Sequence, residues 1–389
     1  MQLYRQVLAL PGVRTLLVLI FFARLPSTAA GMTLTLHVAV TMDRGYGAAG
    51  TVGAVATVGI ALGAPVMGRV VDRYGLRKML LITTAGEVTF WLVARFLPFP
   101  LLLVCGFFGG ILVLPAMSIG RQAIAALVPT DLRRSAYSMD TVSTELSFML
   151  GPFAAVFVAT QFSTQTAMLV MACGLVLVGA LLYVVDPAVR SEAEKAAAGR
   201  VPRSEWLTPR LLGVLVIAAG AVFILAGTEV AVVAHMQASG DLNWTGVVLA
   251  VWAAGSAVGG LVYGALHRAI PQVMLMACLG VLTIPVGLAG EWWLLMLVLL
   301  PAAALCAPTV AATAEDVTLL APPAVRGVAT GLQSSAFTLG SAAGAPVVGF
   351  VVDHASPAWG FAVAGVGGLL VAGVSALLSV RRKELVPVR

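Results

Sequence analysis

The chain has 389 residues, of which 60% are hydrophobic and only 10% are charged, with a mean hydropathy of +1.01. A soluble globular domain is about half apolar and about a quarter charged, so this composition argues against a water-soluble fold. The chain is basic, with a net charge of +6, and the placement of its Lys and Arg residues decides what that charge means.

Apolar stretches of about 20 residues recur along the whole sequence, and this is the length of a helix that crosses a bilayer. We predict an all-α membrane protein with twelve transmembrane helices. The first stretch is too long to cross the bilayer without a tilt or a break. In chain order the predicted helices cover 12–40, 46–68, 77–97, 100–126, 136–160, 165–186, 210–236, 243–265, 271–289, 292–313, 326–351 and 358–380.

The longest polar stretch, "DPAVRSEAEKAAAGRVPRSEW" at 186–206, lies between the sixth and seventh predicted helices. We interpret it as a cytoplasmic linker that joins two six-helix bundles. The predicted organisation is an N-terminal bundle at 1–189, a linker at 190–207 and a C-terminal bundle at 208–389.

The basic residues gather on one side of the predicted helices. With the N-terminus in the cytoplasm, 20 of the 23 Lys and Arg residues fall on the cytoplasmic side, whereas Arg44 and Arg95 fall outside and Arg24 lies within a span. Cytoplasmic loops carry the excess of Lys and Arg in membrane proteins. We therefore predict a multi-pass protein of the cell (inner) membrane with both termini cytoplasmic, and we attribute the net charge to topology and not to nucleic-acid binding.

No residue pattern indicates an enzyme, a metal site or a cofactor site. The cysteines are far apart inside apolar segments, the histidines lie near predicted helix ends, and no phosphate-binding Gly-rich loop with its Lys occurs. We expect no catalytic residues, no metal, no cofactor and no ATP-driven pumping. The residues concerned are Cys105, Cys173, Cys278 and Cys306, and His37, His235, His267 and His354.

One phrase occurs twice. "GAPVMGRVVD" at 63–72 closes the second predicted helix, and "GAPVVGFVVD" at 344–353 closes the eleventh, which runs in the opposite direction across the membrane. Related patches, "LGPFAA" at 150–155 and "VGGLVYG" at 258–264, lie in the fifth and eighth helices. A spacing of three helices predicts four three-helix units, and inverted repeats of this kind are typical of secondary transporters.

The stretch "GRVVDRYGLRK" at 68–78 resembles the signature loop of the major facilitator superfamily. This resemblance implies two pseudo-symmetric six-helix bundles that move against each other. "ELSFMLGP" at 145–152 is similar to the helix 5 signature of the family's exporters, but it lacks the flanking glycines. The Arg that drug-antiporter members carry in helix 4 is replaced by Leu103. Gly151 and Pro152, with Gly344 and Pro346, are the expected packing motifs of helices 5 and 11.

The signature loop is expected to act as a conformational latch. An aspartate at a helix C-terminus is disfavoured by the helix dipole, so Asp72 needs Arg73, Arg77 or the N-terminus of another helix as a partner. The resemblance implies the N-terminus of helix 11, near Arg326, and the alternative is that the basic residues only anchor the topology. Glycine would allow a close backbone approach and a tight turn. The latch residues are Gly68, Asp72, Arg73, Gly75, Arg77 and Lys78.

Ionisable residues within spans are costly, so they are candidates for function. Arg24 shares one face of the first helix with Thr28, and we expect it to contact substrate or to act as a cavity counter-charge. The alternative is an interhelical hydrogen bond. Glu145, beyond Asp140 in the fifth helix, is the first choice for a protonatable coupling site, and a fixed salt bridge with Arg24 or Arg121 is its alternative.

Other acidic residues receive different expectations. Glu229 in the seventh helix is a candidate for gating or substrate attraction near the outer mouth, or for an interfacial role. Glu87 in the third helix is expected to form a structural pair. Glu315 and Asp316 are expected to end the tenth helix as gate or surface residues.

The resemblance implies a secondary active transporter that works by alternating access. We expect a proton-coupled exporter of amphipathic or drug-like compounds, acting as a monomer in the lipid bilayer. The alternatives are an importer or exchanger of a small metabolite, which Arg24 would hold if the metabolite is anionic, and a receptor that no longer cycles. The residues expected to line the cavity include Met117, Phe223, Met236, Thr309 and Phe337.

Overall fold

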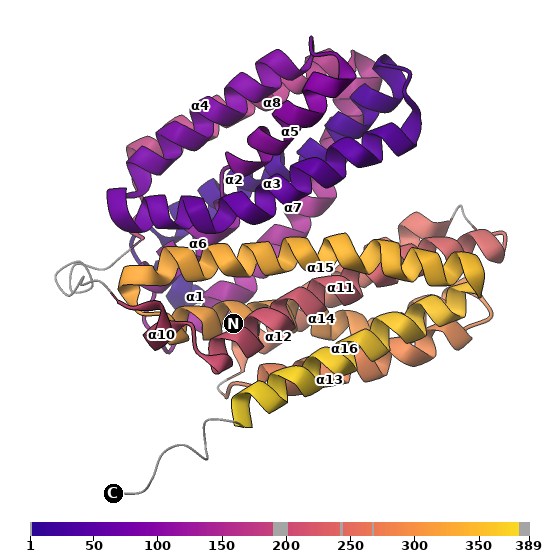
Figure 1. Cartoon of the computed structure of the whole chain (residues 1–389). Coiled ribbons are helices and arrows are strands. Elements are labelled where there is room, and N and C mark those ends of the chain that lie inside the picture. The colour runs from indigo at the N-terminus through magenta and orange to yellow at the C-terminus, as the bar shows by residue number, and fades with distance from the viewer. Residues whose placement is uncertain (1, 190–200, 242–243, 267, 381–389) are drawn as a thin grey trace, which may run out of the picture.

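The computed structural model describes residues 2–189, 201–241, 244–266 and 268–380, and within these ranges every regular element is helical (Figure 1). The helices of the first half are α1 (Gln2–Ala9), α2 (Val13–Leu36), η1 (His37–Thr41), α3 (Gly45–Tyr74), α4 (Leu76–Ala94), α5 (Phe99–Ile111), α6 (Ala116–Leu127), α7 (Arg133–Gln161) and α8 (Thr164–Val185). The remaining helices are α10 (Arg203–Trp206), α11 (Pro209–Ala238), α12 (Thr245–Ala265), α13 (Gln272–Thr283), η3 (Ile284–Leu288), α14 (Trp292–Leu320), η4 (Pro323–Val325), α15 (Arg326–His354) and α16 (Pro357–Val380).

Each of the twelve predicted membrane segments contains at least one of these helices. Ten helical segments in the described residues are long and apolar enough to span a membrane. The other two predicted spans correspond to α4 and to the shorter apolar helix at Gln272–Leu288. The all-α membrane fold expected from composition is therefore confirmed.

Several predicted helix boundaries were wrong, and each error has a local cause. The second span continues to Tyr74 and the tenth to Leu320, because hydropathy marks where the bilayer ends and not where a helix ends. The fourth predicted helix is divided into α5 and α6 just before Pro115, which has no N–H to donate. The first span is helical from Val13 to Thr41 and ends in a π-helical turn at His37–Thr41, so of the two expectations, a tilt or a break, the break is not present.

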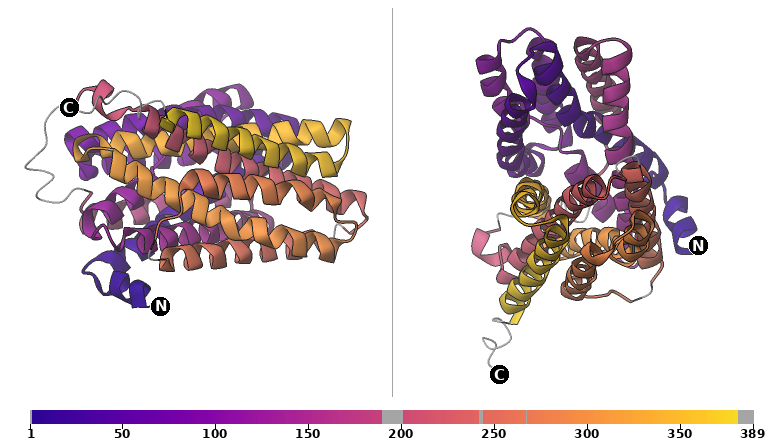
Figure 2. Two further views of the ribbon diagram at one scale, coloured as in Figure 1. Left: turned by 90° about the horizontal axis from the view of Figure 1, so that it is seen from below. Right: turned by 90° about the vertical axis from the view of Figure 1, so that its right-hand side faces the viewer.

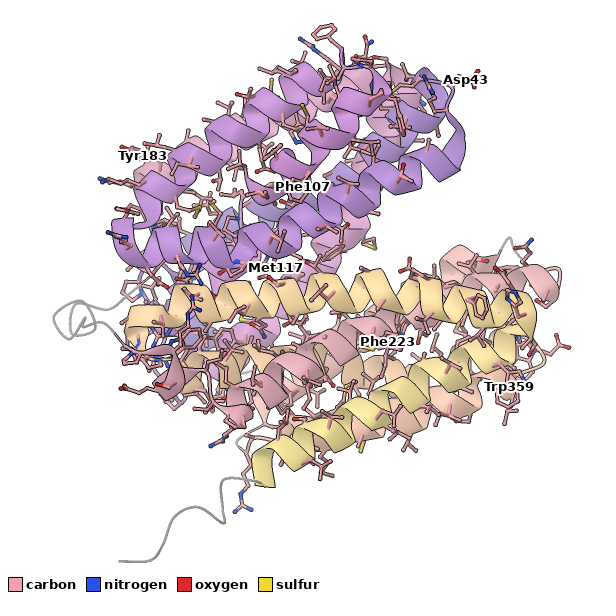
Figure 3. The ribbon with its side chains drawn as sticks, viewed as in Figure 1. Asp43, Phe107, Met117, Tyr183, Phe223 and Trp359 are labelled. Carbon is pink, nitrogen blue, oxygen red and sulfur yellow. The ribbon has the colours of Figure 1, made fainter. Side chains whose placement is uncertain are left out.

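The helices form two groups, α2–α8 and α11–α16, drawn from indigo to magenta and from red to yellow in Figure 1. Figure 2 shows the two bundles side by side when the molecule is viewed approximately along its helices. The bundles meet where α3 ends, which we call the Asp72 end, and they diverge toward the opposite end, which we call the far end. Figure 3 shows Asp43 and Trp359 at the far ends of the two bundles.

The predicted linker lies only partly within the described residues, since 190–200 are outside them. Its last residues form the single turn α10, and the Trp206 side chain is buried. Trp206 packs in one apolar cluster with Leu211 of α11 and Val317 of α14. This end of the linker is therefore attached to the C-terminal bundle.

Candidate functional site

The Asp72 carboxylate contacts the first turn of α15. Its Oδ1 accepts a hydrogen bond from the Gly327 N–H at 3.1 Å, and its Oδ2 accepts one from the Val328 N–H at 2.9 Å. These amides have no partner inside their own helix, and the positive end of the helix dipole favours an anion there. Of the partners considered for Asp72, the helix N-terminus is thus in direct contact with it.

Glycine makes this contact sterically feasible. A Cβ added at Gly68 would lie 2.2 Å from the Gly327 carbonyl oxygen, and one added at Gly331 would lie 2.6 Å from the Ala64 carbonyl oxygen. Neither position has room for a side chain, because the backbones of α3 and α15 are in contact. The close approach expected at Gly68 is present.

The rest of the signature loop is held mainly within the N-terminal bundle. Gly75 has φ = 86°, in the region that favours glycine, and it separates α3 from α4. The Arg77 Nε lies 3.1 Å from Oδ2 of Asp186, at the end of α8, where both side chains are largely exposed. Arg73 and Lys78 both lie over the Tyr74 ring, at 5.2 and 5.5 Å from its centre.

Arg24 and Asp140 form a buried ion pair between α2 and α7. The Arg24 Nη2 lies 2.6 Å from Oδ1 of Asp140, and each residue is only 2% exposed. A Cβ added at Gly120 of α6 would lie 3.2 Å from the same Arg24 nitrogen, so the glycine leaves space for the guanidinium. Arg24 has the geometry of an interhelical contact, which was the alternative to the expected substrate contact.

Thr28 of α2 and Gly151 of α7 form a second close contact between these two helices. The Thr28 hydroxyl donates to the Ser147 carbonyl oxygen at 2.9 Å, and a Cβ added at Gly151 would lie 2.1 Å from that hydroxyl. Pro152 follows within α7. The corresponding motif of α15 has the same function in the other bundle, since a Cβ at Gly344 would lie 2.4 Å from the Phe223 carbonyl oxygen of α11. Pro346 lies inside α15.

Arg121 reaches from α6 into the other bundle. Its Nη1 donates to Oε1 of Gln333 at 2.9 Å, and its guanidinium lies 4.7 Å from the centre of the Phe337 ring. The residue is 2% exposed. One turn before it, the Ser118 hydroxyl lies 2.7 Å from the Thr330 hydroxyl of α15. The short helix after the break at Pro115 therefore forms much of the contact between the bundles.

Further contacts join α7 to the C-terminal bundle. Arg134 forms an ion pair with Glu315 at 3.2 Å, and the Tyr137 hydroxyl donates to the Thr318 hydroxyl at 2.8 Å. Ser135 donates to the Gly264 carbonyl oxygen of α12. Sequence reasoning identified none of these pairs. Because α14 extends to Leu320, Glu315 lies within the helix and not at its end, which corrects that expectation.

Glu145 also contacts the other bundle, but without a cation. The Ser256 hydroxyl of α12 donates to its Oε1 at 2.5 Å, and that hydroxyl accepts a hydrogen bond from the Ala307 N–H at 3.1 Å. The second oxygen, Oε2, is buried and has no hydrogen-bond partner among the described residues. Glu145 forms no ion pair with Arg24 or Arg121, so the alternative of a fixed salt bridge was wrong.

The structure bears on three other expectations about polar and cavity residues, and only the expectation about the cavity residues changes. Glu87 is buried and accepts a hydrogen bond from the Leu114 N–H at 2.9 Å, next to the break before α6. Glu229 is exposed. Met236 and Thr309 are fully buried and so do not line an accessible cavity, whereas Figure 3 places Met117 between the two bundles. Within the described part of the chain, no group of three His, Cys, Asp or Glu residues is arranged to hold a metal ion.

Solved structures of transporters share this fold over nearly the whole chain. The human organic anion transporter MFSD10 (TETRAN) has 20% identity and a TM-score of 0.74, with 94% of this chain and 100% of that chain covered. A bacterial homologue of the iron transporter ferroportin, in an outward-facing state, has 14% identity and a TM-score of 0.75, covering 94% and 99%. The E. coli fucose:proton symporter FucP has 12% identity and a TM-score of 0.66, covering 94% and 98%.

At these identities the likeness shows the fold alone, and no curated protein matches the sequence. The family is shown by the sequence itself. The family model of the Major Facilitator Superfamily matches residues 16–290 and 230–388, which together include nearly all of the chain. This protein belongs to the Major Facilitator Superfamily.

Proposed function

We propose that this protein exports amphipathic small molecules across the cell membrane by alternating access, driven by the proton gradient. The family and the fold make it a secondary transporter. The direction of transport, the driving ion and the class of substrate form the proposal. The observation that carries it is the contact between Glu145 and Ser256, which joins the two bundles through a carboxyl group.

Glu145 is proposed as the site of proton coupling. A carboxylate without a cation is costly inside a bilayer, and one oxygen of Glu145 has no partner in the described residues. Its other oxygen holds Ser256 of the opposite bundle, so a change in its protonation acts directly on the interface. The carboxyl group of Asp140 has a different role in this proposal, because it is committed to Arg24.

Asp72 is proposed as the latch that holds the bundles together at one end. Its two hydrogen bonds end on backbone amides of α15 and break when α3 and α15 separate. Hydrogen bonds to a charged group contribute about 1.5–3 kcal/mol each, which is sufficient to favour one state and small enough to be reversed during a cycle.

The positive-inside rule places the Asp72 end in the cytoplasm in this proposal. The conformation is then outward-open, because the bundles meet at the Asp72 end and diverge toward the far end (Figure 1). The helix 5 sequence that ends in Gly151 and Pro152 is similar to an exporter signature and supports export. The half-buried Met117, which lies between the two bundles, supplies an apolar surface there, as an amphipathic substrate requires.

The experiment uses purified protein in proteoliposomes with an imposed pH gradient and a fluorescent amphipathic dye. We expect the gradient to drive dye accumulation by the native protein. Glu145→Gln should abolish the response to the gradient while dye exchange without a gradient continues. Glu291→Gln is the matched control, since Glu291 is an exposed residue at the start of α14.

Gradient-driven transport that persists in Glu145→Gln would move the coupling site to another residue. Transport by the native protein that ignores the gradient would contradict proton coupling as a whole. Dye binding without any transport would favour the receptor that no longer cycles.

One observation supports a second candidate, the transport of a small organic anion. Arg121 is buried and forms no ion pair within the described residues, whereas Arg24 is paired with Asp140. The direct partner of Arg121 is a neutral amide, that of Gln333. This candidate would be favoured over the first by two results together. The native protein should take up an organic anion and not transport the dye, and the uptake should fail in both Arg121→Gln and Arg121→Lys.

A further inference from the structure

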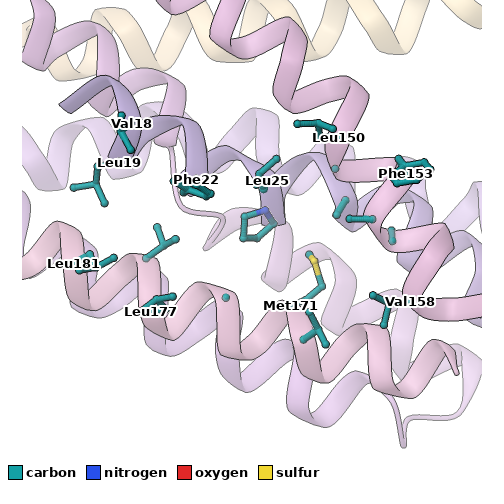
Figure 4. Close-up of a pocket in the computed structure, with 18 of the residues that line it drawn as sticks. Val18, Leu19, Phe22, Leu25, Leu150, Phe153, Val158, Met171, Leu177 and Leu181 are labelled. Atoms are coloured by element: carbon teal, nitrogen blue, oxygen red, sulfur yellow. The ribbon is translucent and has the colours of Figure 1, made fainter. Parts of the chain in front are cut away.

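A long apolar groove runs along the N-terminal bundle, away from the contacts between the two bundles. It lies between α2, α7 and α8 and has a volume of about 1000 Å³. Figure 4 shows Phe22 and Leu25 of α2, Phe153 of α7 and Leu177 of α8 around it. This volume is at the upper limit of about 300–1,000 Å³ that is usual for ligand pockets.

The groove lies on a surface that the bilayer covers. Many of its side chains are highly exposed, including Phe22 (52%), Phe153 (68%) and Leu177 (62%). We take this exposure to be toward lipid, because the three helices are candidate spans and α8, which forms one wall, packs on α2, α4 and α7 of its own bundle. A second hollow of about 310 Å³, between α2 and α7, shares Val18 and Phe22 with the groove and extends the concave surface around α2.

The opposite bundle is closed at the corresponding place. There α11 and α16 are in close contact, since a Cβ at Gly367 would lie 2.7 Å from the Phe223 ring and one at Gly368 would lie 2.3 Å from Ile224. Gly174, at a similar position of α8, has only the Pro26 ring nearby, and a Cβ there would lie 3.7 Å from it. The groove is thus a feature of one bundle and not of the repeated fold.

The groove ends at a cation. Arg14, in the first turn of α2 at the Asp72 end, is the only ionisable residue among the described residues of its lining. The Arg14 Nε donates to the Leu8 carbonyl oxygen at 2.5 Å, and its terminal nitrogens form no hydrogen bond with any described residue. The nearby acid at the end of α8, Asp186, is paired with Arg77. Among the described residues, the mouth of the groove therefore carries one positive charge that is available to an anion.

We propose that this groove binds a phospholipid with an anionic headgroup, with its acyl chain along α2 and α8 and its phosphate at Arg14. In a bilayer the gain comes from packing, because a concave wall contacts more atoms of a chain than a flat one does. A basic residue near the membrane surface attracts an anionic headgroup and provides the selectivity. The site is separate from the proposed substrate path and independent of the proposed function.

The experiment titrates the delipidated full-length protein in neutral detergent with phosphatidylglycerol or phosphatidylcholine and counts bound lipid by native mass spectrometry. We expect one phosphatidylglycerol to bind about fivefold more tightly than phosphatidylcholine, as one basic residue near a membrane surface provides. Arg14→Gln should remove this preference, and Arg14→Lys should retain it.

Gly174→Leu tests the groove itself, because the added side chain extends into it. This variant should lose the bound lipid whatever its headgroup. Gly373→Leu is the matched control on α16, where a Cβ would have nothing within 4 Å, and it should bind lipid as the native protein does. Both changes replace a helical glycine with the same residue, so their effects on helix propensity are equal.

Equal binding of the two lipids by the native protein would overturn the proposal, and so would unchanged binding in Gly174→Leu. If Gly174→Leu does not elute as a monodisperse protein, the lipid preferences of Arg14→Gln and Arg14→Lys decide whether the proposal holds. Displacement of phosphatidylglycerol by the amphipathic dye at the concentrations that are transported would assign the groove to substrate and overturn the lipid proposal.

Discussion

Asp72 is unfavourably placed in its own helix and favourably placed against another. It lies in the last turn of α3, where the helix dipole disfavours an anion by about 0.3–1 kcal/mol. Two amides of α15 reverse this balance, since each hydrogen bond to a charged acceptor contributes about 1.5–3 kcal/mol. The carboxylate therefore has these two hydrogen bonds only while the bundles are closed at the Asp72 end, as a latch requires.

The first prediction concerns this charge. Asp72→Asn removes the charge and replaces one acceptor oxygen with a donor that faces an amide. The closed Asp72 end should lose about 1.5–3 kcal/mol, which shifts the population of the two conformations by about 10–150-fold. Spin labels at Phe96 and Trp359, both exposed at the far end, report the shift as a shorter distance.

Asp353→Asn is the control for this prediction. Asp353 ends the second copy of the repeated phrase, but it is exposed near the end of α15, at the far end of the molecule. It should leave the distance distribution as it is in the native protein. An unchanged distribution in Asp72→Asn would show that the contact does not control the conformation.

The second prediction distinguishes a structural Arg24 from one that binds substrate. Breaking a buried ion pair by removing one partner costs about 3–5 kcal/mol, because the other charge stays buried and unpaired. Arg24→Gln and Asp140→Asn should each lower the melting temperature in detergent. The double variant should recover most of the loss, since it leaves neither charge. Recovery of less than half of the loss would show that Arg24 acts mainly outside this pair.

At the scale of helices, hydropathy predicted the spans well and the functional contacts poorly. All twelve predicted spans contain helices, because a bilayer imposes length and composition on whatever crosses it. The polar ends of α3 and α14 were missed because helix continuation there depends on the contacts of those ends with the opposite bundle. Pairs such as Arg134 with Glu315 could not be predicted, because their partners are separated by 181 residues and have no helical spacing. The contact of Asp72 with the N-terminus of α15 could be predicted only from the resemblance of the loop at 68–78 to the family's signature loop.

The third prediction tests the crossing of α3 and α15. Gly68→Ala places a methyl group where the Gly327 carbonyl oxygen lies, so the two helices must separate. We expect transport to be lost and the Asp72 end to open, with the same shortening between labels at Phe96 and Trp359. Gly53→Ala on the same helix has nothing within 4 Å of the added group and should be neutral or slightly stabilising. Full activity of Gly68→Ala would show that the crossing can loosen without consequence.

At the scale of the molecule, the contacts between the bundles are unevenly distributed. Hydrogen bonds between the described parts of the two bundles lie in the halves of the helices nearest the Asp72 end, from Asp72 with α15 to Glu145 with α12. Ser335, the residue of α15 farthest from that end to bond across, donates to Ala61 in the middle of α3. A rocking movement that opens the Asp72 end must break this set together, so the bundles behave as two rigid bodies.

The last prediction fixes the two bodies by a covalent bond. The hydroxyl oxygens of Ser118 and Thr330 are 2.7 Å apart on opposite bundles, so Ser118→Cys with Thr330→Cys should form a disulfide when the native cysteines are replaced. Oxidation should stop transport and reduction should restore it, because the bond prevents the Asp72 end from opening. Thr41→Cys with Thr164→Cys is the control, since these hydroxyls are 2.5 Å apart within one bundle and their disulfide leaves the movement between bundles free. Transport that continues with the Ser118–Thr330 pair fully oxidised would require a cycle in which this end never opens, and alternating access between these two bundles could not then be the mechanism.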